Sequence, residues 1–393
     1  MGGVSMETYK LSDLCVILDA KRKPLSALQR AKKQGIYPYY GAQGIIDHLD
    51  DYLLDGEYLL VAEDGANLET RNQPIANIAK GKIWVNNHAH VLGSNGKCPL
   101  NLLGFILNNM NISPYVTGCA QPKLNQENLR NMEIELPSHI DSIASILSSL
   151  DRKIELNNKI NADLEEMAQA IFKNWFVDFE PFKDGKFVDS ELGMIPEGWK
   201  VGRADDFYQI NIGKTPPRKE HKWFSTNPAD KIWVSIANMG NSGIFISDSS
   251  EYLTKEAVDS HNIIMVPRNT ILLSFKLTVG RVAIADKELT TNEAIARFIL
   301  SDDKYMEYLY LYLKKYDYNS LGSTSSIATA VNSKTIKGMQ MLQPSDNVID
   351  AFHIQVNPIF EKIRSLTKEN SRLSLLRDTL LPRLMSGELE VPE

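Results

Sequence analysis

Two stretches of the sequence set the fold, and the first of them, residues 140–175, reads IDSIASILSSLDRKIELNNKINADLEEMAQAIFKNW. Its apolar residues recur at alternating steps of three and four positions, the heptad pattern of a helix that packs against another helix. The second stretch, residues 349–384, has the same rhythm, and a shift of 209 positions places Asn161 on Asn370. Two such helices in one register, half a chain apart, predict an internal duplication.

Proline residues are expected to bound both helices. The first helix follows Pro137 and stops before Pro181, because proline lacks the amide that a helix interior needs. In the second stretch, Pro358 is expected in the first turn of the main portion of the helix with Asn357 as the N-cap, and Pro382 is expected to close the helix. At 1.5 Å per residue, helices of roughly 40 residues would each be about 60 Å long.

The remaining sequence predicts two globular domains of mixed α and β structure. Both contain short β-like runs broken by Gly, Asn, Asp and Pro, with a few helical stretches among them. A chain of 393 residues also exceeds one ordinary hydrophobic core. A short match that pairs Asn87 with Asn292 supports the duplication of the domains. We therefore predict an α+β fold with four regions: a first domain at 1–138, a long helical region at 139–186, a second domain at 187–345 and a second long helical region at 346–393.

Composition places the chain among soluble globular proteins. The hydrophobic fraction is 43%, the charged fraction is 23% and the formal net charge is −6. No apolar run is long enough to span a membrane, and the first residues do not have the pattern of a signal peptide. Three widely spaced cysteines, Cys15, Cys98 and Cys119, fit neither a disulfide framework nor a zinc cluster. These features predict a cytoplasmic location.

The negative net charge argues against nucleic-acid binding only until it is divided by region. The excess of acidic residues lies in the two helical regions, and the two globular domains are nearly neutral. Basic loops rich in Gly, Ser, Thr and Pro suit DNA, because Lys and Arg bind phosphates, and a solvated basic face is the alternative. The basic clusters are Lys21, Arg22, Lys23, Arg30, Lys32 and Lys33 in the first domain, and Lys214, Arg218, Lys219 and Lys222 in the second.

No catalytic or metal-binding motif is complete. The Gly-Lys-Thr run at 213–215 lacks the first glycine of a phosphate-binding loop, since Tyr208 stands six residues before the lysine. The Asn-Pro-Ile-Phe run at 357–360 opens a heptad helix without a cofactor-binding loop. His88 and His90 have no third ligand nearby, which favours a polar or DNA-facing role over a metal site. The sequence therefore predicts no catalytic residue, no metal and no cofactor on this chain.

Eight stretches of the chain form a distinctive set when they are taken in order. They are YPYYGAQGII at 37–46, GEYLLVAEDG at 56–65, VNNHAH at 85–90, LDRKI at 150–154, NWF at 174–176, IPEGW at 195–199, GKTP at 213–216 and LPRLMSGEL at 381–389. Together they resemble the specificity subunit of type I restriction–modification enzymes. The resemblance covers nearly the whole chain, although the first domain lacks the Pro-Glu-Gly-Trp motif that opens the second.

The resemblance implies a non-catalytic subunit with two target-recognition domains. Such a subunit would bind double-stranded DNA and join two methyltransferase subunits and two restriction or motor subunits into one complex. S-adenosylmethionine, ATP and Mg²⁺ would be bound by those partners. The complex would methylate adenine at N6 or cleave DNA, according to the methylation state, in bacterial defence.

The duplicated plan gives this function a mechanism. Two long helices packed antiparallel as a coiled coil would hold one recognition domain at each end and relate the halves by a pseudo-twofold axis. Two short half-sites would then be read across an unread spacer of fixed length, with centres about 34 Å apart, one DNA turn. Asn161 and Asn370 occupy corresponding seam positions and are predicted to face each other and fix the register, with exposure to solvent as the alternative.

The residues predicted to contact DNA combine the basic clusters with amide and aromatic side chains near them. Lysines are expected on phosphates, and Gln43, Asn87 and Arg218 are candidate base readers, because amide and guanidinium groups can form two hydrogen bonds to one base. The full set is Lys21, Arg22, Lys23, Tyr40, Gln43, Asn86, Asn87 and His88 in the first domain, and Lys214, Thr215, Arg218, Lys219, Lys222, Lys276 and Arg281 in the second.

Two other classes of protein remain open. A stand-alone nuclease or methyltransferase with an unrecognised site would be active without partners. A coiled-coil scaffold would bind proteins through both domains and would have no affinity for DNA in its assembled complex.

Overall fold

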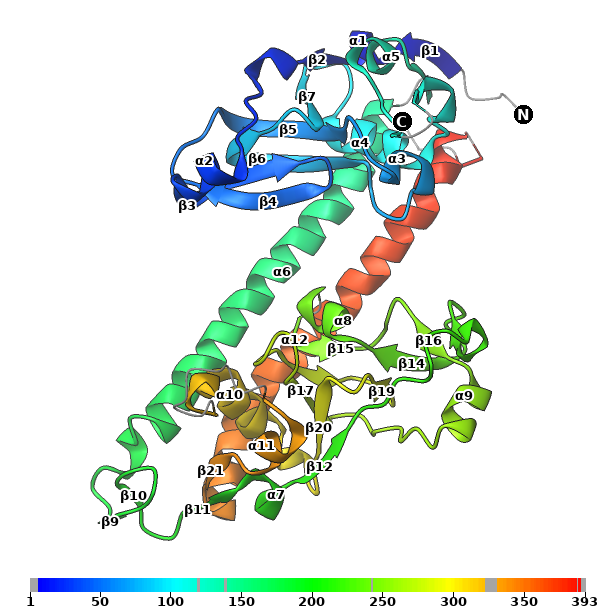
Figure 1. The fold of residues 1–393 in the computed structure, drawn as a ribbon. Coiled ribbons are helices and arrows are strands. Elements are labelled where there is room, and N and C mark those ends of the chain that lie inside the picture. The colour runs from blue at the N-terminus through cyan, green and yellow to red at the C-terminus, as the bar shows by residue number, and fades with distance from the viewer. Residues whose placement is uncertain are drawn as a thin grey trace. The chain divides into compact units, whose positions relative to one another are not determined.

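The computed structural model describes residues 6–118, 121–137, 140–241, 243–321, 331–386 and 388–389. These residues form the mixture of helices and strands that was predicted (Figure 1). They divide into two compact units. Unit 1 holds the residues up to Ile154 together with those from Arg372 onward, and unit 2 holds residues 155–371. Each unit therefore contains one globular domain and part of both long helices.

The two heptad stretches form α6, Ile140–Phe176, and α12, Asp346–Met385. α12 begins at Asp346, the first residue of the second helical region expected from the sequence. The N-cap expected at Asn357 with Pro358 in the first turn, and the stop expected at Pro382, are wrong, because α12 continues through both of its prolines. Phe352, Val356 and Phe360 are fully buried on either side of Pro358. Their packing holds the helix together where the amide of proline is missing.

Within unit 2 the two long helices run antiparallel. Asn157 of α6 donates to Oδ1 of Asn370 in α12 at 2.9 Å. Further along α6, the Trp175 ring lies 5.7 Å from the Phe352 ring, which is near the start of α12. Contacts occur in this order only when the two helices run in opposite directions.

A six-stranded sheet in the order β2-β7-β5-β6-β3-β4 forms the centre of unit 1 (Figure 1). Its neighbouring strands are antiparallel except for β3 and β6, which are parallel. A separate pair joins β1 to β8. The strands are β1 Met6–Lys10, β2 Cys15–Ile17, β3 Gln34–Gly41, β4 Gly44–Leu49, β5 Leu54–Ala62, β6 Ala76–Val85, β7 Ala89–Ser94 and β8 Glu133–Pro137. The helices are α1 Leu11–Leu14, η1 Asp19–Lys21, α2 Ala27–Ala31, α3 Asn67–Thr70, α4 Leu100–Asn109, η2 Ser113–Tyr115 and α5 Gln126–Arg130.

Unit 2 has a five-stranded sheet in the order β12-β20-β17-β18-β15 and a four-stranded sheet in the order β13-β16-β14-β19. Two further pairs join β9 to β10 and β11 to β21. The strands are β9 Phe187–Val188, β10 Ile195–Pro196, β11 Lys200–Arg203, β12 Gln209–Ile212, β13 Phe224–Ser225, β14 Lys231–Val234, β15 Phe245–Ile246, β16 Tyr252–Leu253, β17 Ile271–Ser274, β18 Val282–Ala285, β19 Thr290–Thr291, β20 Ile295–Ile299 and β21 Gln340–Gln343. The helices are η3 Glu180–Phe182, α7 Ala204–Phe207, η4 His221–Trp223, α8 Ile236–Asn241, α9 Lys255–Ser260, η5 Asp303–Tyr305, α10 Met306–Lys315, η6 Tyr318–Leu321 and α11 Ser333–Lys337.

The first elements of the two domains are equivalent. In unit 1 the Leu11 amide, which follows β1, donates to the Met132 carbonyl at 2.8 Å. In unit 2 the Ala204 amide, which follows β11, donates to the Met339 carbonyl at 2.8 Å. The β1–β8 and β11–β21 pairs therefore occupy the same place in the two repeats, and Leu11 corresponds to Ala204.

Each unit has its own hydrophobic core, and the long helices contribute to both. Leu381 and Leu384 of α12 are buried with the strands and α4 of unit 1, whereas Phe172 and Phe176 of α6 are buried with α10 and α12 in unit 2. Burial of apolar surface of this kind is the main favourable term in folding. No helix among the described residues combines the length and apolar character needed to cross a lipid bilayer.

Candidate nucleic-acid interface

Two turns of unit 1 meet at one end of its sheet. Because β3 and β6 are parallel and pair at Tyr40 and Val85, both strands end at the same edge. The turn after β3 contains Gln43, and the turn after β6 runs from Asn86 to His88. The Asn86 amide donates to the Tyr40 carbonyl at 3.0 Å and joins the two turns, and the Tyr40 side chain is half-buried there.

The basic segment after β2 lies against the same turns. The Lys23 amide donates to the Val85 carbonyl at 3.1 Å, and the Trp84 indole donates to the Lys23 carbonyl at 2.7 Å. The predicted contact residues of unit 1 thus come together at one edge of the sheet. Those with exposed side chains are Lys21, Lys23, Gln43, Asn87 and His88.

The side chains of Arg22 and Asn86 turn into the protein. Arg22 is 15% exposed, and its Nη1 lies 2.5 Å from a Glu63 carboxylate oxygen and 3.0 Å from the Ala89 carbonyl oxygen. Asn86 is 5% exposed, and its Oδ1 accepts from the His88 amide at 2.8 Å. In the structure these two side chains hold the loops in place, and the direct DNA contact predicted for them stays a prediction.

A buried network of charges supports these loops. His90 is fully buried, with Nδ1 2.6 Å from Asp19 and Nε2 2.7 Å from the Leu124 carbonyl oxygen. Of the two roles predicted for it, polar or DNA-facing, the structure shows the polar one. Ligand atoms of Asp19, Glu63 and His90 lie within 4.8 Å of one another, but Arg22 pairs with both carboxylates and Lys123 pairs with Glu63 at 3.2 Å. Burial alone would raise the pKa of Asp19, yet the hydrogen bond and charge of His90, with Arg22, hold that pKa below its usual value.

Unit 2 repeats the loop arrangement with different residues. Strands β14 and β19 are parallel and pair at Val234 and Thr291. The Asn292 amide donates to the Val234 carbonyl at 3.0 Å, and the Lys214 amide donates to the Thr291 carbonyl at 2.8 Å. As in unit 1, an indole donates to the lysine carbonyl, here from Trp233 to Lys214 at 3.2 Å. Trp233 lies on β14, the counterpart of β3, whereas Trp84 of unit 1 lies on β6.

These hydrogen bonds make Lys23 equivalent to Lys214, and Asn86 equivalent to Asn292. Each asparagine Oδ1 also accepts from the amide two residues later, at 2.8 Å in unit 1 and 3.1 Å in unit 2. The match that paired Asn87 with Asn292 is therefore wrong by one position. That match was based on residue types, whereas the hydrogen bonds show which residues occupy the same structural position in the two units.

Gly213 allows a close approach of two backbone segments. A β-carbon on this residue would lie 1.9 Å from the Asn292 carbonyl oxygen, so no side chain fits where the loop crosses the end of β19. The glycine of the Gly-Lys-Thr sequence therefore allows the backbone of the loop to take this path. The Lys214 side chain is exposed, and its Nζ donates to the His261 carbonyl.

Thr215 and Lys276 come together around Glu293. The Thr215 hydroxyl donates to the Glu293 carboxylate. Burial would raise the pKa of Glu293, but this hydrogen bond and the charges of Lys276 and Arg218 hold the pKa below its usual value. Lys276 follows β17 directly, so predicted residues from two distant segments lie around one carboxylate.

The other predicted residues of unit 2 differ in their exposure. Lys219 and Lys222 are exposed, and the Lys222 ammonium lies 4.1 Å from the centre of the Trp223 ring. The Arg281 side chain turns inward, with Nη1 donating to the Ile236 carbonyl at 2.8 Å. Arg281 thus has a structural contact, and its DNA contact stays a prediction.

Arg218 is stacked on an aromatic ring and held by a carboxylate. Its guanidinium carbon lies 4.5 Å from the centre of the Trp233 ring, and Nη1 lies 2.7 and 2.8 Å from the two Glu251 carboxylate oxygens. A cation over an aromatic face is attracted by the ring's quadrupole. The side chain is half exposed, so it is positioned and still accessible.

Unit 1 has a counterpart on the equivalent strand. The Arg30 guanidinium carbon lies 5.4 Å from the centre of the Tyr39 ring, and Nε lies 2.8 Å from Asp47. Asp47 is the residue of β4 that pairs with Tyr39 of β3. Sequence analysis selected Arg218 but not Arg30, although Arg30 belongs to the first basic cluster. We call the two triads the arginine clamps: Arg30, Tyr39 and Asp47 in unit 1, and Arg218, Trp233 and Glu251 in unit 2.

The asparagine contact between the long helices of unit 2 involves other residues than predicted. Asn370 Oδ1 accepts from Asn157 at 2.9 Å, and Asn370 Nδ2 donates to Asn158 Oδ1 at 2.8 Å. Asn161 lies further along α6, and its Oδ1 is buried without a hydrogen-bond partner. The partner of Asn370 is therefore corrected, because a shared heptad register aligns equivalent positions but does not say where the helices meet.

Comparison with known proteins adds the family. The family model described as the type I restriction modification DNA specificity domain matches residues 3–166 and 196–346, more than half of the chain. The HindI specificity subunit of a type I restriction enzyme from Haemophilus influenzae is 29% identical over 332 residues, 68% of this chain and 71% of the relative. The MjaIX specificity subunit from Methanocaldococcus jannaschii is 32% identical over 288 residues, 70% of this chain but only 65% of the relative.

One solved structure supports the fold. The crystal structure of a type I restriction–modification S subunit from M. genitalium matches with a TM-score of 0.54, at 14% identity, over 100% of this chain and 98% of that one. At this identity the similarity concerns the fold alone. The two separate matches to the family model agree with the equivalent hydrogen bonds of units 1 and 2.

Proposed function

The chain belongs to the family of type I restriction–modification DNA specificity subunits, and from this membership we propose that it reads a bipartite DNA site, one half with each unit. The observation that carries the proposal is the repeated loop arrangement. Equivalent exposed lysines, Lys23 and Lys214, lie beside equivalent asparagine turns at the ends of parallel strands. Two domains with the same loop arrangement are suited to binding two half-sites, one half-site each.

The exposed lysines would bind phosphates, and the side chains between them would read bases. Gln43 and Asn87 lie on the two turns of unit 1 and can each form two hydrogen bonds to adenine. The arginine clamps add one guanidinium to each unit. Glu251 engages Arg218 through Nη1, and among the described residues no other hydrogen bond of Arg218 is present, so its remaining donors can pair with guanine.

We further propose that the long helices set the length of the unread spacer and carry the partner subunits. Two methyltransferase subunits and two restriction or motor subunits would assemble on this non-catalytic chain, and they would bind S-adenosylmethionine, ATP and Mg²⁺. Exposed apolar side chains on the helices support a docking role, because such residues mark surfaces for association. They include Leu156 and Met167 on α6 and Ile354 and Leu375 on α12, which are 51–75% exposed.

The proposal is tested by reconstituting the chain with methyltransferase subunits from its own genome and mapping methylated adenines in DNA. We expect a bipartite motif with a constant gap. A continuous motif would contradict the two-reader proposal. Methylation or cleavage by the purified chain alone would favour a stand-alone enzyme, and an assembled complex without DNA affinity would favour a scaffold.

A further inference from the structure

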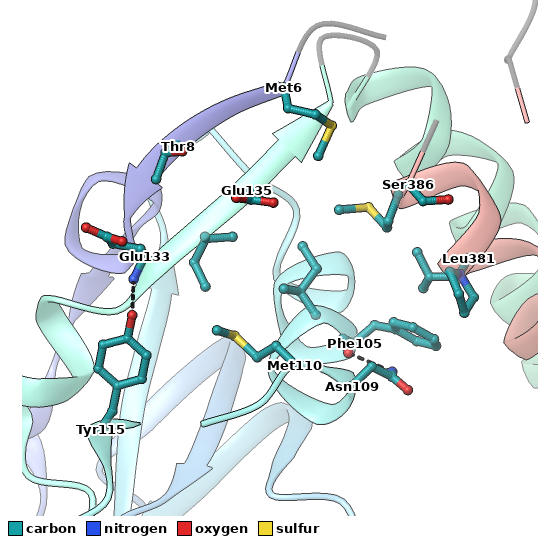
Figure 2. Close-up of a pocket in the computed structure, with 14 residues that line it drawn as sticks. Met6, Thr8, Phe105, Asn109, Met110, Tyr115, Glu133, Glu135, Leu381 and Ser386 are labelled. Atoms are coloured by element: carbon teal, nitrogen blue, oxygen red, sulfur yellow. Dashed lines mark hydrogen bonds between the residues drawn. The ribbon is translucent and has the colours of Figure 1, made fainter. Parts of the chain in front are cut away.

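Unit 1 has an apolar hollow that plays no part in the loop arrangement at the sheet edge. It has a volume of about 540 Å³ and lies between the β1–β8 pair, α4 and the last turn of α12 (Figure 2). Met6, Met110 and Leu381 border it, together with Ile106 and Met385. These five side chains are flexible or aliphatic, and Phe105 and Tyr115 are the aromatic residues of the lining.

The equivalent positions of unit 2 are aromatic. Because Leu11 corresponds to Ala204, Met6 corresponds to Trp199. The other pairs follow from the 209-residue shift between the long helices and from the two ten-residue helices α4 and α10. The remaining pairs are Leu381 with Phe172, Met385 with Phe176, Ile106 with Tyr312 and Met110 with Tyr316.

Unit 2 closes this place with its own chain. The segment after α6 turns back, and the Trp199 ring lies 5.7 Å from Phe176, 5.6 Å from Phe179 and 5.1 Å from Phe182. Trp199 is only 7% exposed as a result, whereas Met6 in unit 1 is 40% exposed. The same architecture is therefore filled by a tryptophan in unit 2, whereas no described residue fills it in unit 1.

The rim of the hollow is acidic in unit 1 only. Glu133 and Glu135 of β8 line it and are exposed, and among the described residues neither carboxylate has a basic partner (Figure 2). The equivalent residues of β21 are uncharged, Gln340 and Leu342. An occupant that brings a positive charge would satisfy these carboxylates.

We propose that the hollow is a docking site for a segment of a partner protein that inserts one aromatic side chain and places a Lys or Arg beside Glu133 and Glu135. Such a segment would supply to unit 1 the aromatic ring that Trp199 supplies in unit 2. This site is independent of DNA reading. An aromatic anchor in a preformed apolar pocket, with a charge at its edge, is the usual composition of an interface hot spot.

The experiment uses the full chain labelled with ¹³C in its methionine methyl groups, because Met6, Met110 and Met385 line the hollow and the other methionines serve as internal controls. The probe is the blocked dipeptide acetyl-Trp-Lys-amide, and the matched control is acetyl-Trp-Glu-amide. We expect the Trp-Lys probe to cause saturable ring-current shifts at these three methyl signals alone. The Trp-Glu control is expected to bind at least about threefold more weakly, since its charge repels the rim.

Two variants separate the aromatic pocket from its charge. Glu133→Gln with Glu135→Gln should remove the difference between the dipeptides, and Ile106→Tyr with Met110→Tyr should fill the hollow and abolish the shifts. Unchanged signals of the other methionines show that each variant is folded. If the tyrosine variant does not fold, the proposal is tested with the glutamine variant alone. The absence of saturable shifts, or equal affinity for both dipeptides in the unmodified chain, would overturn the proposal. Shifts of the same methyls on raising the protein concentration alone would assign the hollow to a second copy and overturn it too.

Discussion

The guanidinium group of Arg218 lies 4.5 Å from the centre of the ring of Trp233, a residue of β14 in unit 2. Arg30 stands in the same relation to Tyr39 in unit 1. Both arginines are held by a ring and a carboxylate before any ligand arrives, so less side-chain entropy is lost when they bind. Arg218 is the stronger candidate for reading a base because it is half exposed, whereas Arg30 is 22% exposed and its Nη1 also donates to the Leu25 carbonyl at 2.9 Å.

We expect Arg218→Ala to weaken recognition of one half-site only. Loss of a guanidinium that forms two hydrogen bonds to a base costs about 1–3 kcal/mol and relaxes specificity at that position. Arg30→Ala should have the same effect on the other half-site. Competition binding of the assembled complex to DNA with single base changes in each half measures both effects.

Arg218→Lys is the matched control, because it keeps the positive charge and loses the planar fork. It should resemble Arg218→Ala in base preference and the unmodified chain in salt dependence. If Arg218→Ala weakened binding to specific and unrelated DNA by the same factor, the residue would be a phosphate contact and the assignment as a base reader would fail.

Lys21 and Lys23 are expected to contribute to phosphate binding without supporting the fold. Lys21→Ala with Lys23→Ala should lower the slope of log affinity against log salt by up to about 0.9 for each phosphate that the loop no longer binds. The thermal midpoint of unfolding should not change, because both side chains are exposed. An unchanged slope would remove this loop from the interface.

Asp19 should stabilise unit 1 in a pH-dependent manner. Its pKa is lowered in the folded chain, so its stabilisation is fully present above the unfolded pKa of about 4 and is lost as the pH falls through the lower, folded pKa. Asp19→Asn leaves His90 and Arg22 without this charge and should cost about 3 kcal/mol at neutral pH. Chemical unfolding at pH 7 and below pH 4 should show that the difference from the unmodified chain shrinks in acid. A difference that is constant with pH would rule out the ion pair as its cause.

Asn157 and Asn370 should show an energetic coupling. A double-mutant cycle of Asn157→Ala and Asn370→Ala should give about 0.5–1.5 kcal/mol in the free energy of unfolding, the value of one net hydrogen bond. Asn161 is the internal control. Asn161→Ala should show no coupling to Asn370, because the buried Asn161 Oδ1 has no hydrogen-bond partner. A larger coupling for Asn161 than for Asn157 would restore the pairing predicted from the sequence.

The long helices were predictable because a heptad repeat is a local pattern. The continuity of α12 through Pro358 was not, since the burial of Phe352, Val356 and Phe360 outweighs the local preference of Pro358 for a first turn. Local rules describe one segment at a time. Packing against the rest of the unit decides whether a helix continues through such a residue.

The candidate site was predictable in its location but not in the roles of single residues. Lys21 and Lys23 lie on the surface as expected, whereas Arg22 between them is held by Glu63, forty-one positions later. Arg30 was not among the predicted DNA contacts, because only the pairing of β3 with β4 brings its partner Asp47 close to it. Which member of a basic cluster is free to bind depends on contacts between distant segments, and a single sequence does not contain them.

The central claim is that each unit reads one half of the DNA site independently of the other. It is tested most directly by replacing residues 187–345 with the corresponding region of another family member and mapping the adenines methylated by the reconstituted complex. The account predicts a motif in which one half is changed and the other half is retained. A motif with both halves changed, or with neither changed, would contradict it.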